Sequence, residues 1–562
     1  MLEFYDLVVV GSGWFGLGAA RAYIQTHPKE NITVLESEQS VGGTWSQNRL
    51  YPGLKSNNML GSYEFPDYPM DSEVYGIKPG GHIPGAVLSR YLTDFAREFG
   101  ILERTKFNTT VTEVEPSSSS GWKLTVKTLS GERVVETAKL ILATGLTSTP
   151  NIPSYRGADD FGNPFFHAKD FCRKAPELKG VKNVVVVGGA KSAYDVAYAM
   201  VESGATVDLV IRPNGHGPVW IAPRHVTPLK KRMDIILNVR FMSWFSPCPW
   251  GSEDGYPRTR QFLHNTAIGR FIVKCFWKVL CNDVLTANDY DSHPELSKLK
   301  PWHPVFWIGS GLSILNYDTS LFDMVKQGRI RVHIEEIDHL EPGQVVLDSG
   351  ERLTADALIC STGWKKESTI KFHGLEKSGL GLQLSSKEKT QLSAEFDEKV
   401  LAMFPILRDQ PQLRFQPGPA DPLRYYRFMV PPALLEKRNL AFAGMISSVS
   451  TSIASTVQGI WISKYLDGDL DRMAQTNEAV INEIMLHTQW GKWRYPCGYG
   501  ASLPDFVFEG IPYVDMLLKD LGLNNHRKSS VYKELTSPYT PRDYAGLLDE
   551  LAQKTPAKKV RW

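Results

Sequence analysis

The chain has 562 residues, a length that predicts three or four domains of roughly 150 residues each. A hydrophobic content of 42%, a charged content of 22% and a net charge of +2 are typical of an ordinary globular protein and give no reason to expect a nucleic-acid partner. No run of about eighteen apolar residues predicts a membrane span. The six cysteines form neither a Cys-x-x-Cys pair nor a zinc spacing, so we expect no metal site and reduced thiols. The first predicted strand follows Met1 directly, which argues against a secretory signal peptide and for a cytoplasmic protein.

A glycine-rich turn follows the first predicted strand. Residues 6–10 are apolar and lead into Gly11–Gly16, a Gly-x-Gly-x-x-Gly motif that continues into a predicted helix. The first glycine permits a tight turn, the second lets a pyrophosphate approach the backbone, and the third lets helix and strand pack closely. A second strand, Ile32–Leu35, ends in Glu36, where an acid accepts a hydrogen bond from a ribose hydroxyl. Together these features predict a dinucleotide site.

The rest of the first half is consistent with an α/β unit. Gly42–Trp45 offers two glycines where backbone can pass under a cofactor, and residues 51–58 form a polar, turn-rich segment. Residues 85–99 fit an amphipathic helix. Strands are expected at Thr110–Val114, Trp122–Lys127, Arg133–Glu136 and Leu140–Leu142, the last leading into Ala143-Thr144-Gly145.

The same pattern then recurs. A buried strand at Asn183–Val187 is followed by Gly188–Ala193, a helix, and a strand at Val207–Ile211 that ends in Arg212. Strands near 330–332, 345–353 and 357–363 mirror residues 110–145, so the chain contains two dinucleotide-binding units. An acid at the strand end suits a ribose hydroxyl, whereas a guanidinium pairs with a 2′-phosphate. The first unit is therefore predicted to bind FAD and the second NADPH.

Residues 213–300 interrupt the second unit. Within them, residues 268–281 predict a helix on which Arg270, Lys274 and Lys278 recur among apolar side chains. We favour a lid or helical insertion that packs its apolar face on the domain over an interfacial membrane helix, although peripheral membrane contact through 268–281 stays open. Further helices are expected at 452–465 and 471–487, and the last thirty residues are expected to be mobile.

With these motifs in view, the sequence resembles the FAD- and NADPH-dependent flavin-containing monooxygenases, particularly the fungal type of secondary-metabolite pathways. The resemblance rests on Gly11–Gly16, Gly42–Trp45, Leu54–Asn57, Ala143–Gly145, Gly188–Asp195 and Ser361–Gly363 in that order. The signature Phe-x-Gly-x-x-x-His-x-x-x-Phe/Tyr is matched by Phe161, His167 and Phe171, but Asn163 replaces the glycine and Gly162 precedes it. His167 is either functional or an ordinary linker histidine. Phe171, where Baeyer–Villiger relatives have Trp, favours the N-/S-oxygenating side.

The resemblance implies an enzyme in which NADPH reduces FAD, the flavin traps O2 as a C4a-hydroperoxide, and one oxygen atom enters a small organic substrate. The implied reaction is N-/S-oxygenation or hydroxylation. The implied catalytic residue is Asn57, beside the flavin, and Gln458 is similar to the residue near the flavin ring in the last helix. The expected cofactor-binding residues are Gly11, Ser12, Gly13, Trp14, Phe15, Gly16, Glu36, Gly43, Thr44, Trp45, Ser56, Asn57, Thr144, Gly145, Gly188, Lys191, Ser192, Asp195, Arg212 and Gln458.

Three alternatives stay open. A Baeyer–Villiger monooxygenase would use the same cofactors, a flavin disulfide reductase would need a cysteine pair near the flavin, and a non-catalytic flavin-binding protein would not need Asn57 or Arg212. The fold expected is α/β, with an NADPH-binding Rossmann-like domain inserted in an FAD-binding one. The expected boundaries are 1–150 (FAD, first part), 151–335 (NADPH, with a helical insertion at about 222–300), 336–465 (FAD, second part) and 466–562 (C-terminal extension).

Overall fold

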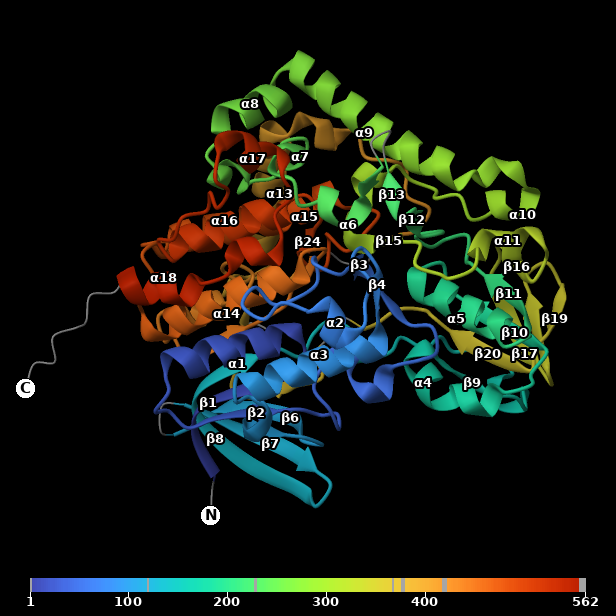
Figure 1. The fold of residues 1–562 in the computed structure, drawn as a ribbon, viewed down its shortest axis with the longest axis horizontal. Helices are drawn as coiled ribbons and strands as arrows, with labels where there is room; N and C mark the ends of the chain where they lie inside the picture. The colour runs from blue at the N-terminus through green and yellow to red at the C-terminus, as the bar shows by residue number, and fades with distance from the viewer. Residues whose placement is uncertain are drawn as a thin grey trace, which may run out of the picture.

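The computed structural model describes residues 3–118, 121–226, 230–365, 368–375, 380–416 and 422–554. Two sheets organise this part of the chain, one towards the bottom and one towards the right of Figure 1, and a helical region lies above the first. The α/β class with two Rossmann-like units is confirmed.

The larger sheet has eight strands and is built around β1. Its strands are β1 (Glu3–Val10), β2 (Ile32–Leu35), β5 (Thr105–Lys106), β6 (Thr110–Pro116), β7 (Trp122–Thr128), β8 (Gly131–Leu142), β21 (Lys371–Phe372) and β22 (Leu440–Phe442). β1 runs parallel to β2 and β8, and Val10 pairs with both Leu35 and Leu142. The carboxyl ends of these three strands therefore meet at one edge, where dinucleotide folds bind their ligand.

The smaller sheet is wholly parallel, with the order β16-β11-β10-β20-β9. Its strands are β9 (Phe165–His167), β10 (Asn183–Val187), β11 (Thr206–Val210), β16 (Ile330–His333) and β20 (Ala357–Cys360). An antiparallel sheet of β17 (Ile337–Glu341), β18 (Gln344–Leu347) and β19 (Arg352–Thr354) precedes β20. β10 is a continuous apolar run because both of its faces are buried, and β11 is equally buried but has Asp208 at its centre, paired with Arg331 and His333.

After β20 the chain returns to the larger sheet through β21 and β22, so the second unit is inserted in the first. β20 pairs with β10 and β9, so a division at 335/336 would separate it from its two strand partners. The domain boundaries stay predictions.

Three helices support the larger sheet. They are α1 (Trp14–Thr26), α3 (Gly85–Glu98) and α14 (Thr451–Asp467), and α5 (Lys191–Glu202) follows β10 in the smaller sheet. α1 and α14 approach closely, because a Cβ on Gly18 would lie 2.6 Å from the carbonyl oxygen of Ser455. Nearly every side chain of α14 is buried, and its residues are mostly apolar or small and polar.

The interruption of the second unit contains short strands and several helices, of which α10 (Pro294–Ser297) is the last. The others are β12 (Trp220–Ala222), β13 (His225–Val226), β14 (Lys231–Arg232), α6 (Met233–Ile236), α7 (Arg240–Ser243), α8 (Pro257–Asn265), α9 (Ala267–Asn288) and, further on, β15 (Leu312–Ile314). α9 confirms the helix expected at 268–281 and runs along the upper rim in Figure 1. Val273, Trp277 and Val284 are buried, so the helix packs on the domain as expected. Among the described residues, no helix is long and apolar enough to cross a membrane.

The C-terminal extension is packed, including residues 533–554 of the end that we expected to be mobile. Its helices are α15 (Asn477–Arg494), α16 (Gly510–Asp520), α17 (Val531–Thr536) and α18 (Leu547–Lys554). Tyr539 and Tyr544 have no exposed surface, because the polar residues around them form buried ion pairs instead of facing solvent. α15 begins at Asn477 rather than 471 because the Thr476 hydroxyl caps it. Residues 555–562, with Lys558, Lys559 and Arg561, lie outside the described part.

Candidate dinucleotide sites

The first glycine-rich turn lies between β1 and α1. Gly11 has a φ of +100°, and a Cβ there would lie 2.5 Å from the carbonyl oxygen of Ala143. A Cβ on Gly16 would lie 1.9 Å from the Gly11 carbonyl oxygen. Both positions therefore require glycine for the fold. Gly13 differs, because a Cβ there would meet only Gly43, at 3.6 Å.

The N-terminus of α1 faces this open space. Gly13 is the N-cap residue, no side chain caps the helix, and its first turn carries no acid. The Gly42 N–H donates to the Ser12 carbonyl at 2.9 Å, which holds Gly43 beside Gly13. The result is a backbone cradle with uncapped N–H groups, and this is the environment that a pyrophosphate needs.

Glu36 lies at the end of β2, beside the turn, and is buried. One carboxylate oxygen accepts from the Ser12 N–H at 2.7 Å and the Ser12 hydroxyl at 2.6 Å. The other accepts from the Glu38 N–H at 2.9 Å. The structure places Glu36 beside Ser12, and its contact with a ribose stays a prediction.

The second turn repeats the geometry of the first. Gly188 has a φ of +136°, and a Cβ there would lie 2.5 Å from the carbonyl oxygen of Ser361, as at Gly11 and Ala143. α5 also starts without a side-chain cap or an acid in its first turn. Arg212 follows β11 and is exposed, and no carboxylate lies within ion-pair distance of it in the described part of the chain. The cradle and the cation both fit a dinucleotide with a 2′-phosphate.

Lys191 and Asp195, both expected to contact NADPH, form an ion pair with each other on α5. The Asp195 carboxylate also accepts from the hydroxyls of Tyr51, at 3.0 Å, and Tyr317, at 2.9 Å. The Lys191 ammonium lies 4.5 Å from the Tyr317 ring centroid. Burial raises the pKa of both tyrosines well above the ordinary value, so both hydroxyls remain donors. This cluster joins the polar segment 51–58 to the second unit, and the sequence did not indicate the two tyrosines.

Asn57 lies on β3 (Lys55–Met59), which pairs with β4 (His82–Pro84). Its side chain is half-buried, and its Oδ1 accepts from the Ser313 hydroxyl of β15 at 2.9 Å. No partner of the Asn57 amide nitrogen is found among the described residues, so a donor is available.

The neighbouring Ser56 and His82 stabilise the backbone of this strand. The Ser56 hydroxyl accepts from the Ile83 N–H at 3.1 Å, and His82 Nδ1 donates to the Ser56 carbonyl at 3.0 Å. Burial lowers the pKa of His82 to about 4, so this histidine is neutral near pH 7. Ser56 therefore supports β3, and a direct cofactor contact by its side chain stays a prediction.

Two expected cofactor residues have their side chains in the core. Trp14 is buried and packs on Tyr63 at a centroid distance of 4.6 Å, so only its backbone can meet a ligand. Gln458 has no exposed surface; it accepts from the Gly444 N–H at 2.9 Å and donates to the Tyr513 hydroxyl at 2.8 Å. A Cβ on Gly444 would touch the Phe15 ring. Gln458 therefore supports the first glycine-rich turn through the Gly444 backbone and is not part of the turn itself. Of the other expected residues, Thr44, Gly145 and Ser192 are exposed, and Gly43, Trp45 and Thr144 are half-buried.

The altered signature around residue 163 is accommodated locally. Gly162 has a φ of +78° and supplies the left-handed position, while the Asn163 amide donates to the Ala355 carbonyl at 2.8 Å. His167 is buried, its Nδ1 accepts from the Lys169 N–H, and burial lowers its pKa. Phe171 packs on Tyr51 at 5.7 Å. The His167 Nε2 is buried without a hydrogen-bond partner among the described residues, so both interpretations of this histidine stay open.

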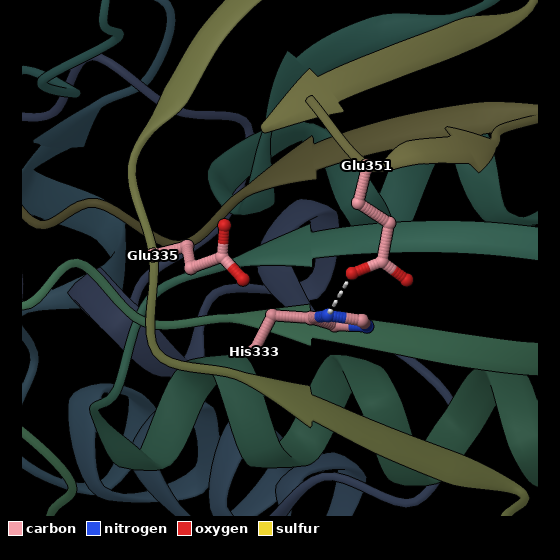
Figure 2. Close-up of side chains that lie close together, drawn as sticks. All are labelled: His333, Glu335 and Glu351. Carbon is pink, nitrogen blue, oxygen red and sulfur yellow. Dashed lines mark ion pairs between the residues drawn. The ribbon is translucent and has the colours of Figure 1, made fainter. Parts of the chain in front are cut away.

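Figure 2 shows a separate group of charged side chains next to the end of β11. The ligand atoms of His333, Glu335 and Glu351 lie within 4.8 Å of one another, a spacing that could hold a metal ion. His333 Nε2 lies 2.8 Å from Asp208 and Nδ1 lies 3.6 Å from Glu351, so ion pairing also accounts for the geometry. The expectation that the chain has no metal site stays a prediction.

Two glycine turns lead into uncapped helices, and one unit has a buried acid at its second strand end where the other has an exposed arginine. These features define the class of proteins with two dinucleotide-binding units. Residues 8–241 match the family model described as pyridine nucleotide-disulphide oxidoreductase. An FAD-dependent monooxygenase of Pyrenophora dematioidea is 34% identical over 554 residues, which are 94% of this chain and 100% of the relative. A second one, from Alternaria brassicicola, is 34% identical over 98% of this chain and 95% of its own length.

The chain therefore belongs to the fungal FAD-dependent monooxygenases, and it is an oxidoreductase of the monooxygenase class. Among solved structures, the polycyclic ketone monooxygenase of Thermothelomyces thermophila has a TM-score of 0.61. That match covers 92% of this chain and 88% of the other at 16% identity, so it shows a shared fold.

Proposed function

We propose that the protein is an FAD-dependent, NADPH-consuming monooxygenase that transfers one oxygen atom from O2 to a small organic substrate by N-/S-oxygenation or hydroxylation. The relatives in Pyrenophora and Alternaria support the use of FAD, and their fungal origin is consistent with secondary-metabolite biosynthesis. The free state of all six cysteines is consistent with a cytoplasmic enzyme and gives no support to disulfide reduction.

The observation that carries the proposal is the presence of two similar backbone cradles with oppositely charged side chains nearby, Glu36 at the first and Arg212 at the second. The turn at Gly13 and the uncapped α1 would hold the FAD pyrophosphate, with Glu36 beside the ribose. The turn at Gly188 and α5 would hold NADPH, with Arg212 at its 2′-phosphate. FAD supplies the activation of O2 when it is bound. Within the chain, the free amide donor of Asn57 is in place to hold an oxygen atom by hydrogen bonding, and Ser313 orients that amide.

Baeyer–Villiger oxidation is the second candidate, because the solved structures with this fold include ketone monooxygenases. Phe171 in place of Trp favours the first candidate. Purified protein should release FAD on heating, consume NADPH and O2 together, and place one labelled atom from ¹⁸O2 in its product. Identification of the product as a lactone or ester would establish the second candidate. Absence of both flavin and O2 uptake would exclude a monooxygenase.

A further inference from the structure

Exposed apolar side chains form a stripe on the outer face of α9. Ile268, Phe271 and Val279 are each about two-thirds exposed, at 67%, 67% and 68%, and Ile272 is exposed at 38%. Spacings of three, four and seven residues place these four side chains, the α9 stripe, on one side of the helix. The opposite side holds the buried Val273, Trp277 and Val284. The stripe therefore faces outward along the rim that Figure 1 shows.

The part of α8 and α9 that holds the stripe carries only one sign of charge, and the first acid on α9 is Asp283, about one turn beyond Val279. Between Pro257 and Asn282 the chain has five basic residues and no Asp or Glu. One of them, Arg260, is buried and paired with Asp254, and Lys274 pairs with Asp409 on the surface. Lys278 is exposed and has no ion pair among the described residues. An exposed apolar stripe beside cations matches the chemistry of a surface made of anionic lipid headgroups over acyl chains.

We propose that α8 and α9 dock the enzyme on anionic membrane surfaces, with the α9 stripe at the boundary between headgroups and acyl chains. No described helix crosses a membrane, so the contact is peripheral. Phe262 of α8, 45% exposed, extends the apolar surface, since the end of α8 packs against Gly269 of α9.

The C-terminal end of α9, beyond the stripe, is connected to the Asn57 region. Asn288 of α9 donates to the Ile221 carbonyl of β12 at 2.6 Å, and β12 pairs with β15. β15 carries Ser313, the partner of Asn57. An apolar substrate dissolved in the membrane would then reach the enzyme on the side where β12 and β15 lie. This last step rests on the proposed function, whereas docking itself does not.

Sedimentation of the flavin-loaded full chain with vesicles tests the proposal. Vesicles of phosphatidylcholine with about 30% phosphatidylserine should bind the protein, pure phosphatidylcholine should bind it less, and roughly 0.5 M salt should weaken binding to the anionic vesicles. Phe271→Ser with Val279→Ser should weaken binding by about tenfold or more. Lys278→Glu should have an effect of similar size.

Matched controls lie on the β7–β8 hairpin, far from α9 in Figure 1. Leu129, 87% exposed, changed to Ser, and exposed Lys127, changed to Glu, should leave binding unchanged. Flavin content and NADPH oxidation without vesicles should equal those of the parent in every variant. If the variant with both Phe271→Ser and Val279→Ser loses flavin, the vesicle binding of Lys278→Glu alone tests the proposal.

Two results would overturn docking. One is failure of the parent to bind anionic vesicles. The other is a parent dimer in sedimentation velocity that Phe271→Ser dissociates, with no preference for vesicles, because the stripe would then join two copies of the chain. Neither result depends on oxygenation, so a failure of docking is distinguishable from a failure of the proposed function.

Discussion

Gly13 and Gly16 belong to one motif, but their surroundings differ. The Gly13 position has open space with an ordinary φ of −76°, whereas a Cβ on Gly16 would overlap the Gly11 carbonyl. Gly13→Val should therefore fold with an unchanged melting temperature and lose most of its FAD, because the side chain occupies the cradle. Gly16→Ala should lose both FAD and stability. Full flavin content in folded Gly13→Val would show that FAD does not bind at this turn.

Arg212 is exposed and has no carboxylate partner in the described structure, so its guanidinium is available to a 2′-phosphate. Loss of a charge-assisted hydrogen bond costs about 1.5–3 kcal/mol, or roughly ten- to a hundredfold in affinity. Arg212→Ala should weaken NADPH binding by this factor and leave NADH nearly unchanged, measured by the rate of flavin reduction against cofactor concentration. Arg212→Lys should retain part of the preference. An equal loss for both cofactors would remove the assigned role.

Asn57→Ala should retain FAD and reduction by NADPH but release more H2O2 in place of oxygenated product. Removal of a buried hydrogen-bond donor costs about 1–3 kcal/mol, or roughly five- to a hundredfold in the ratio of the two outcomes. Ser313→Ala should show a smaller change in the same direction, because Asn57 then loses its 2.9 Å orienting contact. Asn58→Ala is the control. A fall in flavin content together with stability would mean that Asn57 only maintains β3.

Residue spacing predicted the parts of the site that are close in sequence. Glu36 after Gly11–Gly16 and Arg212 after Gly188–Ala193 each have their place set by a strand-turn-helix-strand unit, so their distances along the chain carry the information. Ser313 could not be predicted, since its contact with Asn57 spans 256 positions. Gln458 was named from the resemblance alone. In the structure its amide oxygen accepts from the Gly444 N–H and its amide nitrogen donates to the Tyr513 hydroxyl.

At the scale of elements, the contact between α1 and α14 depends on two small residues. A Cβ on Gly459 would lie 2.5 Å from the Gly18 carbonyl oxygen. Gly459→Ala should therefore force the helices apart and lower the free energy of unfolding by about 1–3 kcal/mol, measured by denaturant unfolding. Gly311→Ala is the matched control, because a Cβ there meets only Ile308, at 3.6 Å. Equal stability of the two variants would contradict the close helix contact.

The helices and strands that bury a face could be predicted from the hydrophobic pattern of the sequence. The apolar runs of β1, β2, β10 and β11 and the amphipathic pattern of α3 were sufficient. β8 was expected as two strands, but nothing between Glu136 and Leu140 forces a turn, and the structure continues through it. On α9 the pattern indicated a helix but not which apolar side chains would be covered, because that depends on Phe245, Phe306 and Phe508 around Trp277.

At the scale of the molecule, the internal repeat predicted two sheets and the insertion of one unit in the other. The packing of the C-terminal extension was not predictable, because its polar residues resemble a solvated tail. Arg240 of α7 has no exposed surface and contacts Asp515 of α16 and Glu534 of α17, with Nε to Glu534 at 2.8 Å. Arg240 thus joins the insertion to the C-terminal extension by ion pairs between residues that are far apart in sequence. A local sequence pattern cannot predict such pairs.

Removal of Arg240 should leave Asp515 and Glu534 buried without a cation. Loss of one partner from a buried ion pair costs about 3–5 kcal/mol. Arg240→Met, which retains most of the side-chain volume, should lower the free energy of unfolding by this amount. Arg408→Met is the matched control, since its ion pair with Glu398 is exposed and contributes little.

The pH dependence separates a charge effect from a packing effect. Burial raises the pKa of Asp515 to about 6 even with Arg240 beside it, above the ordinary value of about 3.9. A carboxyl with a raised pKa stabilises the folded state below its unfolded pKa, and this stabilisation is lost as pH rises through the folded value. Without Arg240 the pKa rises further, so Asp515 is neutral at about pH 5.5 and the variant is least impaired there. The difference in unfolding free energy between parent and Arg240→Met should therefore grow from about pH 5.5 to 8. A constant difference over this range would assign the loss to packing and not to the unpaired carboxylates.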